Sequence, residues 1–133
     1  MPRHACHVAV RWSDMDAYGH VNNAVYLTYL EECRDRLVEG MFAGEAWDFV
    51  LAHVGVDYRS ELTREDGSVV VECEVVGFGA SSVRTRERIV AADGRLAAEG
   101  ESVIVPRDPQ TGRSRPLTDG ERATLQRVLD AGG

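Results

Sequence analysis

The sequence contains no lysine. All 15 basic residues are arginine, against 22 acidic residues, which gives a formal net charge of −7. Because nucleic-acid binding requires a basic surface that neutralises phosphates, this balance argues against a nucleic-acid partner. The planar guanidinium of arginine nevertheless suits phosphate groups, so individual arginines stay candidates for a small phosphorylated ligand.

Cysteines and long apolar runs are also scarce. Cys6, Cys33 and Cys73 are odd in number and far apart, a pattern typical of neither a disulfide framework nor a zinc site. No apolar run approaches the length of a membrane span, and the N-terminus has no hydrophobic signal region. These absences predict a cytoplasmic protein with no membrane association, metal or cofactor. The length of 133 residues fits a single domain over 1–133.

Hydrophobic periodicity predicts one strand, one long helix, several strands and a short closing helix. The predicted strands cover residues 6–12, part of 47–60, 69–77, 81–92 and 95–105, with a loop over 13–21. The closing helix covers 118–129, with Thr118 and Glu121 as a capping box. This order predicts an α+β domain in which an antiparallel sheet of about five strands wraps round one long helix. A lone curved sheet leaves an exposed edge, which dimerisation would cover.

The long helix is the clearest element. It begins at Asn22 or Asn23, since asparagine is a favoured N-cap, and Gly40 supplies a stop near the other end. Its apolar residues recur at spacings of four, three and four and share one face, and they are Tyr26, Leu30, Cys33 and Leu37. Trp12 and Tyr29 are expected to be core or interface aromatics.

Asp16 is the candidate catalytic residue, because it lies just before a glycine turn and the start of this helix. A carboxylate beside a helix N-terminus can act on a substrate carbonyl that the helix amides polarise. It can do so as nucleophile or as general base, and the sequence leaves both open. An Asx-type turn is the alternative role for Asp16. Asp14 is expected to be a loop or dimer-contact residue.

One continuous motif carries a family resemblance. It reads Asp14-Met-Asp16-Ala-Tyr-Gly19-His-Val-Asn-Asn23-x-x-Tyr26-x-x-Tyr29-x-Glu31. The motif resembles the signature of the 4-hydroxybenzoyl-CoA thioesterase family of hotdog-fold proteins, most strongly over residues 9–36. The resemblance implies a hotdog fold and hydrolysis of acyl-CoA, or in some cases acyl carrier protein, thioesters. It also implies a homodimer with active sites between subunits, often paired into a homotetramer.

The resemblance also assigns roles to residues. Asp16 matches the catalytic carboxylate, and the backbone N–H of Asn23 matches the amide that polarises the thioester carbonyl. A second resemblance, to plant acyl-ACP and long-chain acyl-CoA thioesterases, adds His20 and Glu61 as catalytic candidates. The plant enzymes carry an asparagine two positions before the histidine, where this chain has Tyr18, so their full set is not reproduced.

The predicted substrate contacts extend beyond the motif. The substrate-binding candidates are Tyr18, Gly19, Ser82, Arg84 and Arg86. Ser82 resembles a family position near the pantetheine path, and the two arginines share a strand face that can receive CoA phosphates by charge-assisted bonds. A solvated strand face is the alternative for the arginines. The acyl pocket is expected between the helix and the partner subunit, lined by Met41, Phe42, Trp47 and Phe49.

Two other functions are alternatives to hydrolysis. Hotdog domains also serve as non-catalytic acyl-CoA binding modules or sensors, and retention of the acid at position 16 argues against that function here. A hotdog hydratase or dehydratase is disfavoured because the Asp-x-Asn-Pro-x-His pattern typical of that branch is absent. The sequence therefore predicts an acyl-CoA thioesterase whose acyl group is undefined.

Overall fold

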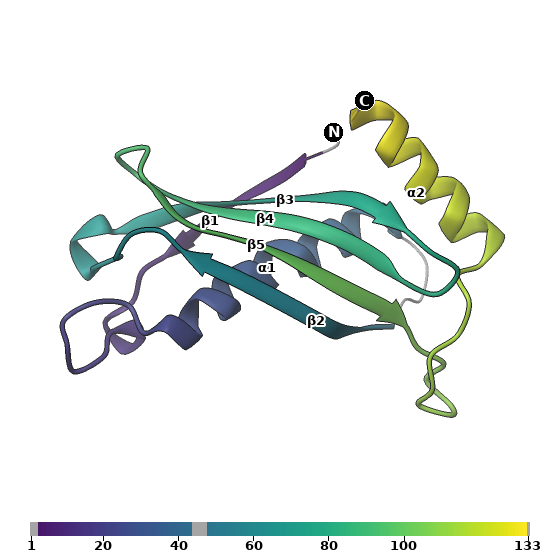
Figure 1. Ribbon diagram of the computed structural model, residues 1–133, viewed down its shortest axis with the longest axis horizontal. Helices are drawn as coiled ribbons and strands as arrows, with labels where there is room; N and C mark the ends of the chain where they lie inside the picture. Colours follow the sequence, from purple (N-terminus) through teal and green to yellow (C-terminus); the bar gives the residue numbers. More distant parts are fainter. Residues whose placement is uncertain (1–2, 44–47, 133) are drawn as a thin grey trace.

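The computed structural model describes residues 3–43 and 48–132. Its helices and strands in chain order are β1 (Arg3–Ala9), α1 (Asn23–Met41), β2 (Phe49–Tyr58), β3 (Ser68–Phe78), β4 (Val83–Ala91), β5 (Leu96–Pro106) and α2 (Asp119–Gly132). The strands form one antiparallel sheet in the order β1-β3-β4-β5-β2. Figure 1 shows this sheet curving over α1, with α2 at one end. The predicted α+β hotdog architecture is confirmed.

Helix α1 buries the face that the periodicity predicted. Tyr26, Leu30, Cys33 and Leu37 are all buried against the sheet. Asn22 caps the N-terminus, as expected, and the other end lies one residue beyond the predicted stop at Gly40. The helix continues to Met41 and is capped by Phe42, because Gly40 keeps a negative φ and does not turn the chain.

The central strands alternate between the helix side and solvent. On β4, Val83, Thr85, Glu87 and Ile89 face inward, in the alternation that gave the strand prediction over 81–92. The register of β3 against β4 shifts between Val75 and Gly77, as at a β-bulge. On the helix side of the sheet, apolar side chains from β1, β3 and β4 therefore meet α1 and form the core.

The first strand differs from its prediction over residues 6–12. It runs from Arg3 to Ala9, and a 3-10 turn, η1 (Trp12–Asp14), follows. The turn forms because the Asp14 carboxylate accepts the Arg11 amide over 2.9 Å and the Arg11 guanidinium over 3.0 Å, so the chain leaves the sheet before Trp12. Trp12 is consequently 74% exposed and is not a core residue of this chain, whereas Tyr29 is buried.

The closing helix is capped as predicted. The Thr118 amide donates to Glu121 Oε1 over 2.8 Å, and the Glu121 amide donates to Thr118 Oγ1 over 3.1 Å. The helix extends beyond the predicted end at 129, to Gly132. Among the described residues no helix is both long and apolar enough to cross a membrane.

Gly100 is required by the close pairing of β2 and β5. A Cβ at this position would lie 2.5 Å from the carbonyl oxygen of Gly55, which is backbone and cannot move aside. We expect Gly100→Ala to lower the free energy of unfolding by about 1–3 kcal/mol, measured by urea denaturation. Gly40→Ala is the control, because a Cβ there meets open space and alanine favours a helix. Equal stability of the two variants would contradict this packing.

Candidate active site

The Asp16 loop, predicted over 13–21, closes on itself just before α1. Met15 and Val21 form an antiparallel bridge. Inside it, the Asp16 amide donates to the His20 carbonyl over 3.0 Å, and the Gly19 amide donates to the Asp16 carbonyl over 3.3 Å. Gly19 has a φ of 88°, a conformation that glycine adopts at little cost. The tight turn thus fixes where the Asp16 side chain lies.

The two carboxylate oxygens of Asp16 have different surroundings. Oδ1 accepts a hydrogen bond from the Tyr18 amide over 2.9 Å, which is the Asx-type turn foreseen as an alternative. Oδ2 lies 3.5 Å from His20 Nδ1. The Asp16 side chain is 16% exposed, so Oδ2 is only partly shielded from solvent. The turn therefore uses one oxygen and leaves the other beside His20.

The first turn of α1 presents an amide without a partner. The Asn22 side chain accepts from the Ala24 amide over 2.9 Å, and the Asn22 carbonyl accepts from the Val25 amide. Asn23 is the first helical residue, and its N–H has no hydrogen-bond partner among the described residues. Such a free donor at a helix N-terminus attracts an anion or a polarised carbonyl oxygen.

Tyr58 is a residue of this site that the sequence did not identify. Its hydroxyl donates to the Asn23 carbonyl over 2.8 Å, and its ring packs edge-on against Tyr26 at 5.0 Å. The bond spans 35 residues and holds the end of β2 against the first turn of α1. The only signal in the sequence was the tyrosine at the end of a predicted strand, which does not indicate a partner.

An open cavity of about 320 Å³ adjoins the free amide. Its lining includes His20, Asn23, Tyr58 and Glu61. The structure therefore brings three of the four predicted catalytic positions to one cavity. Asp16 is not part of the lining and reaches it through its contact with His20. Glu61 is exposed.

The predicted substrate contacts are dispersed in a single chain. Tyr18 is 85% exposed and stacks on His20 with ring centroids 6.2 Å apart, and Gly19 forms the turn beside it. Ser82 lies in the connection between β3 and β4, where its carbonyl accepts from the Gly79 amide. Only Tyr18 and Gly19 thus lie on the Asp16 loop.

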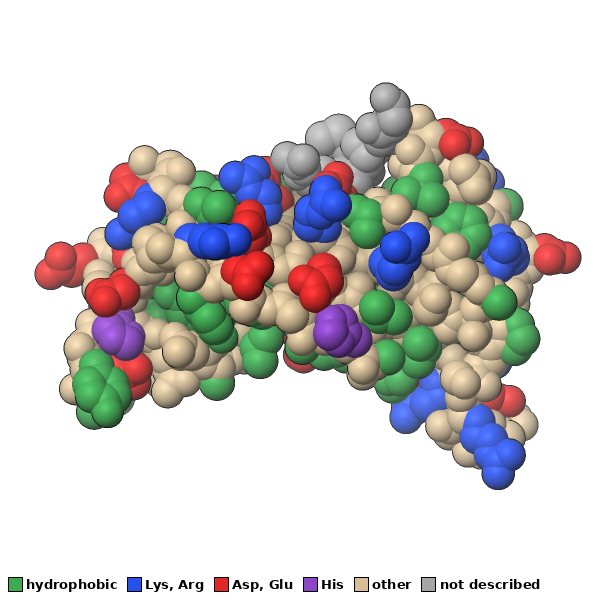
Figure 2. All heavy atoms as spheres, in the orientation of Figure 1, with side chains coloured by type: hydrophobic (Ala, Val, Ile, Leu, Met, Phe, Trp, Pro, Cys, Tyr) green, Lys and Arg blue, Asp and Glu red, His purple; other side chains and the backbone are tan. Residues whose placement is uncertain are grey.

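Arg84 and Arg86 project from the face of the sheet that looks away from α1. Figure 2 shows basic and acidic side chains interspersed over this face. Arg86 lies 4.0 Å from Glu74, and the cavity of about 390 Å³ that it borders also carries carboxylates, among them Glu99 and Glu101. A CoA phosphate bound there would meet these acids, so the geometry agrees with the solvated strand face foreseen as the alternative.

The residues expected to line an acyl pocket do not share one cavity. Phe42 is buried and stacks on Phe49 at 5.5 Å. Phe49 borders a small cavity with Leu51, whereas Met41 borders a different one near α2. Trp47 lies outside the described residues. A single chain does not form the acyl pocket from this set, because the C-terminal turn of α1 separates Met41 from Phe49.

Asp14 is buried and holds the Asp16 loop to α1. The prediction that it is a loop or dimer-contact residue is therefore wrong. It is 1% exposed, and Oδ2 accepts from the Tyr29 hydroxyl over 2.8 Å and from the Arg11 amide over 2.9 Å. Burial acts to raise the pKa of Asp14, but these bonds and the Arg11 guanidinium outweigh it and hold the pKa below its usual value. Asp14 thereby ties the Asp16 loop to α1.

We expect Asp14→Asn to lower the free energy of unfolding by about 2 kcal/mol at pH 7, because charge-assisted hydrogen bonds are lost. The lowered pKa means that this stability is complete above the unfolded-state pKa, near 3.8, and disappears as the pH falls through the folded-state pKa. Urea denaturation from pH 7 to pH 3 measures both effects. Asp130→Asn, at an exposed position on α2, is the control, and identical profiles for the two variants would contradict this role of Asp14.

A buried polar cluster lies between α1 and the sheet. Glu87 accepts from the Thr85 hydroxyl over 2.6 Å and from the Ser102 hydroxyl over 3.0 Å, and Arg34 Nη1 lies 3.4 Å from the same carboxylate oxygen. These four side chains are buried and do not line the cavity of Asn23. Within residues 3–43 and 48–132, no group of three or more His, Cys, Asp or Glu side chains is placed to hold a metal ion.

Residues 10–128 match the thioesterase-like superfamily. The match covers most of the 133 residues, and the chain belongs to this superfamily. The prediction of a thioesterase is confirmed at this level.

Individual relatives agree with the superfamily. Acyl-CoA thioester hydrolase YbgC of Escherichia coli O6:H1 is 28% identical over 83% of this chain and 86% of its own length. Long-chain acyl-CoA thioesterase FadM of E. coli K12 is 24% identical over 92% of this chain and 96% of its own. A thioesterase of Thermus thermophilus, solved in complex with coenzyme A and zinc, is 32% identical over 96% of this chain and 94% of its own, with a TM-score of 0.79.

Proposed function

We propose that the protein hydrolyses an acyl-CoA thioester to a free acid and CoA, as a member of the 4-hydroxybenzoyl-CoA branch. The observation that carries the proposal is the Asn23 N–H at the start of α1, which has no partner within 3–43 and 48–132 and lies beside the cavity that His20 and Glu61 border. Asp16 lies on the adjoining loop, in contact with His20. The relatives named for acyl-CoA hydrolysis support this choice of substrate class.

In this mechanism the substrate carbonyl oxygen accepts the Asn23 N–H, and the positive end of α1 stabilises the negative charge that develops on it. One such donor is typically worth about 3 kcal/mol of transition-state stabilisation. Asp16 either attacks the carbonyl carbon to form an anhydride, which water then cleaves, or removes a proton from an attacking water. In both routes the C–S bond breaks and the CoA thiolate leaves.

His20 and Glu61 are assigned supporting roles. His20 lies between Asp16 and the cavity, so it orients the Asp16 carboxylate toward bound substrate. Glu61 borders the cavity from the opposite chain segment and contacts the leaving group or the attacking water. Ser82, Arg84 and Arg86 stay predictions for the pantetheine arm and the CoA phosphates. Acyl carrier protein is the alternative thiol carrier.

We propose further that the active form is a homodimer, with a homotetramer as its paired form. Strand β2 is an edge of the sheet, and on it Leu51 and Tyr58 are 45% and 46% exposed. A second copy that covers this edge would satisfy its backbone groups and border the cavity next to Tyr58. Sedimentation equilibrium tests this, since the dimer has twice the chain mass of 14.6 kDa.

A panel of acyl-CoAs of different chain length and aromaticity tests the function, with released thiol measured by a colorimetric reagent and binding measured by calorimetry. We expect release of CoA from at least one member at a rate that scales with protein concentration. Tight binding without release across the panel would favour the sensor function instead. The absence of both binding and release across the whole panel would refute the proposed substrate class.

A further inference from the structure

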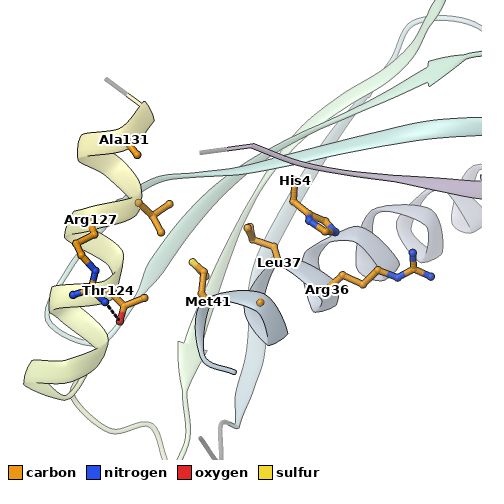
Figure 3. A pocket seen from close by; sticks show the side chains of 9 residues that line it. His4, Arg36, Leu37, Met41, Thr124, Arg127 and Ala131 are labelled. Carbon is orange, nitrogen blue, oxygen red and sulfur yellow. Dashed lines mark hydrogen bonds between the residues drawn. The ribbon is translucent and has the colours of Figure 1, made fainter. Parts of the chain in front are cut away.

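A second cavity lies at the opposite end of α1 from Asn23. It has a volume of about 400 Å³ and lies between the last turns of α1, helix α2 and the start of β1 (Figure 3). With 1.5 Å of rise per residue, the 19 residues of α1 separate it from the Asn23 cavity by roughly 25 Å. None of its lining residues borders the Asn23 cavity. We call this cavity the α1–α2 groove.

The α1–α2 groove has an apolar centre between cationic sides. Leu37, Met41 and Val128 supply the apolar surface, and Figure 3 shows Arg127 on the α2 side and Arg36 on the α1 side. The volume falls in the range of small-molecule pockets, about 300–1,000 Å³. An occupant that fits this lining combines an alkyl segment with an anionic group.

The side chains that line the groove supply more hydrogen-bond donors than acceptors. Among the described residues, Arg36 has no hydrogen bond or ion pair, and the Arg127 guanidinium donates only to Thr124 Oγ1, over 3.2 Å. His4 Nε2 is buried with no partner among these residues. No described acidic side chain lines the groove, in a chain whose formal net charge is −7. Two cations therefore border an apolar surface without a carboxylate to neutralise them.

We propose that the α1–α2 groove binds the free carboxylate of a medium-chain fatty acid. The alkyl chain lies over Leu37, Met41 and Val128, where burial of methylene groups stabilises the complex. The carboxylate binds a guanidinium, since arginine donates two parallel hydrogen bonds to this group. The proposal does not rest on the proposed hydrolysis, because it uses other residues at a distant place on the chain.

Methionine methyl NMR of the full-length protein tests the proposal. The chain has three methionines: Met41 lies in the groove, Met15 lies beside Asp16, and Met1 is at the N-terminus. In a titration of the ¹³C-methyl-labelled protein with decanoate, we expect a saturable shift of the Met41 signal at concentrations that leave Met15 unchanged. Acetate lacks the alkyl chain and decanol lacks the charge. Each should bind at Met41 with a Kd at least fivefold higher than that of decanoate.

The double variant Arg36→Gln/Arg127→Gln isolates the role of charge. We expect it to raise the decanoate Kd at Met41 at least fivefold, with the melting temperature unchanged because both arginines are exposed. Arg64→Gln/Arg113→Gln removes two exposed arginines elsewhere and should leave the Kd as in the wild type. A Met41 signal that never moves, equal binding of decanol, or an unchanged Kd in the groove variant would each overturn the proposal. So would a Met41 shift that accompanies a doubling of mass in sedimentation, since a second copy would then occupy the groove.

Discussion

Asp16→Asn and Asp16→Ala are expected to abolish turnover of acyl-CoA while the fold stays intact. Loss of a general base costs about 10²–10⁴ in kcat, and loss of a nucleophile costs more. Asparagine can still accept the Tyr18 amide through its side-chain oxygen, so Asp16→Asn keeps the turn and removes only the charge. Released thiol measured at saturating substrate gives the loss in kcat, and circular dichroism and thermal unfolding verify the fold.

Asp93→Asn is the matched control for this substitution. Asp93 also occupies a turn and accepts a backbone amide two residues on, that of Arg95, over 3.0 Å. It lies between β4 and β5 and does not border the Asn23 cavity. Its conversion to asparagine should leave kcat unchanged. Near-normal turnover by both Asp16 variants would remove Asp16 from the mechanism and leave it as a turn residue.

The second large effect is expected from Asn23→Pro, which deletes one backbone N–H. Proline is tolerated at the first position of a helix, and Asn22 already has the extended conformation that a residue before proline requires, with φ −60° and ψ 136°. The helix should therefore form, but the substrate carbonyl loses its donor. We expect kcat to fall by about 10²–10³. Steady-state kinetics on the best member of the acyl-CoA panel measure the loss.

Asn23→Ala separates the amide from the side chain. Alanine keeps the N–H, and the Asn23 side chain is exposed with no hydrogen bond among the described residues. The alanine variant should therefore retain most of the wild-type kcat. Thermal unfolding of both variants verifies that the first turn of α1 is intact.

The sequence predicted those parts of the fold that depend on neighbouring residues. The buried face of α1 and the alternation of β4 follow from helical and strand periods, which are local properties. The capping box of Thr118 and Glu121 spans three residues and was predicted for the same reason. Asp16 was predicted from its place before the glycine turn and the helix, the family resemblance matched it to a catalytic carboxylate, and the structure places it on a constrained loop in contact with His20.

The remaining features depend on contacts between distant residues. Asp14 is buried because the Tyr29 hydroxyl, 15 residues away, reaches it, and no local pattern indicates that bond. Tyr58 meets the Asn23 carbonyl across 35 residues. The Glu87 cluster joins α1, β4 and β5, so its burial was visible in the alternation but its partners were not. The site is thus assembled from the Asp16 loop, the start of α1 and the end of β2. Only the folded sheet brings these three segments together.

Half of the proposed catalytic centre is main chain, namely the Asn23 N–H, which borders the cavity that Asp16 reaches through His20. The ratio of kcat for Asn23→Ala to kcat for Asn23→Pro, on one acyl-CoA at saturation, tests it most directly. If the amide polarises the thioester carbonyl, the ratio is about 10² or more, with both variants folded. A ratio near one would show that the reaction does not use this amide and would contradict the site proposed for this protein.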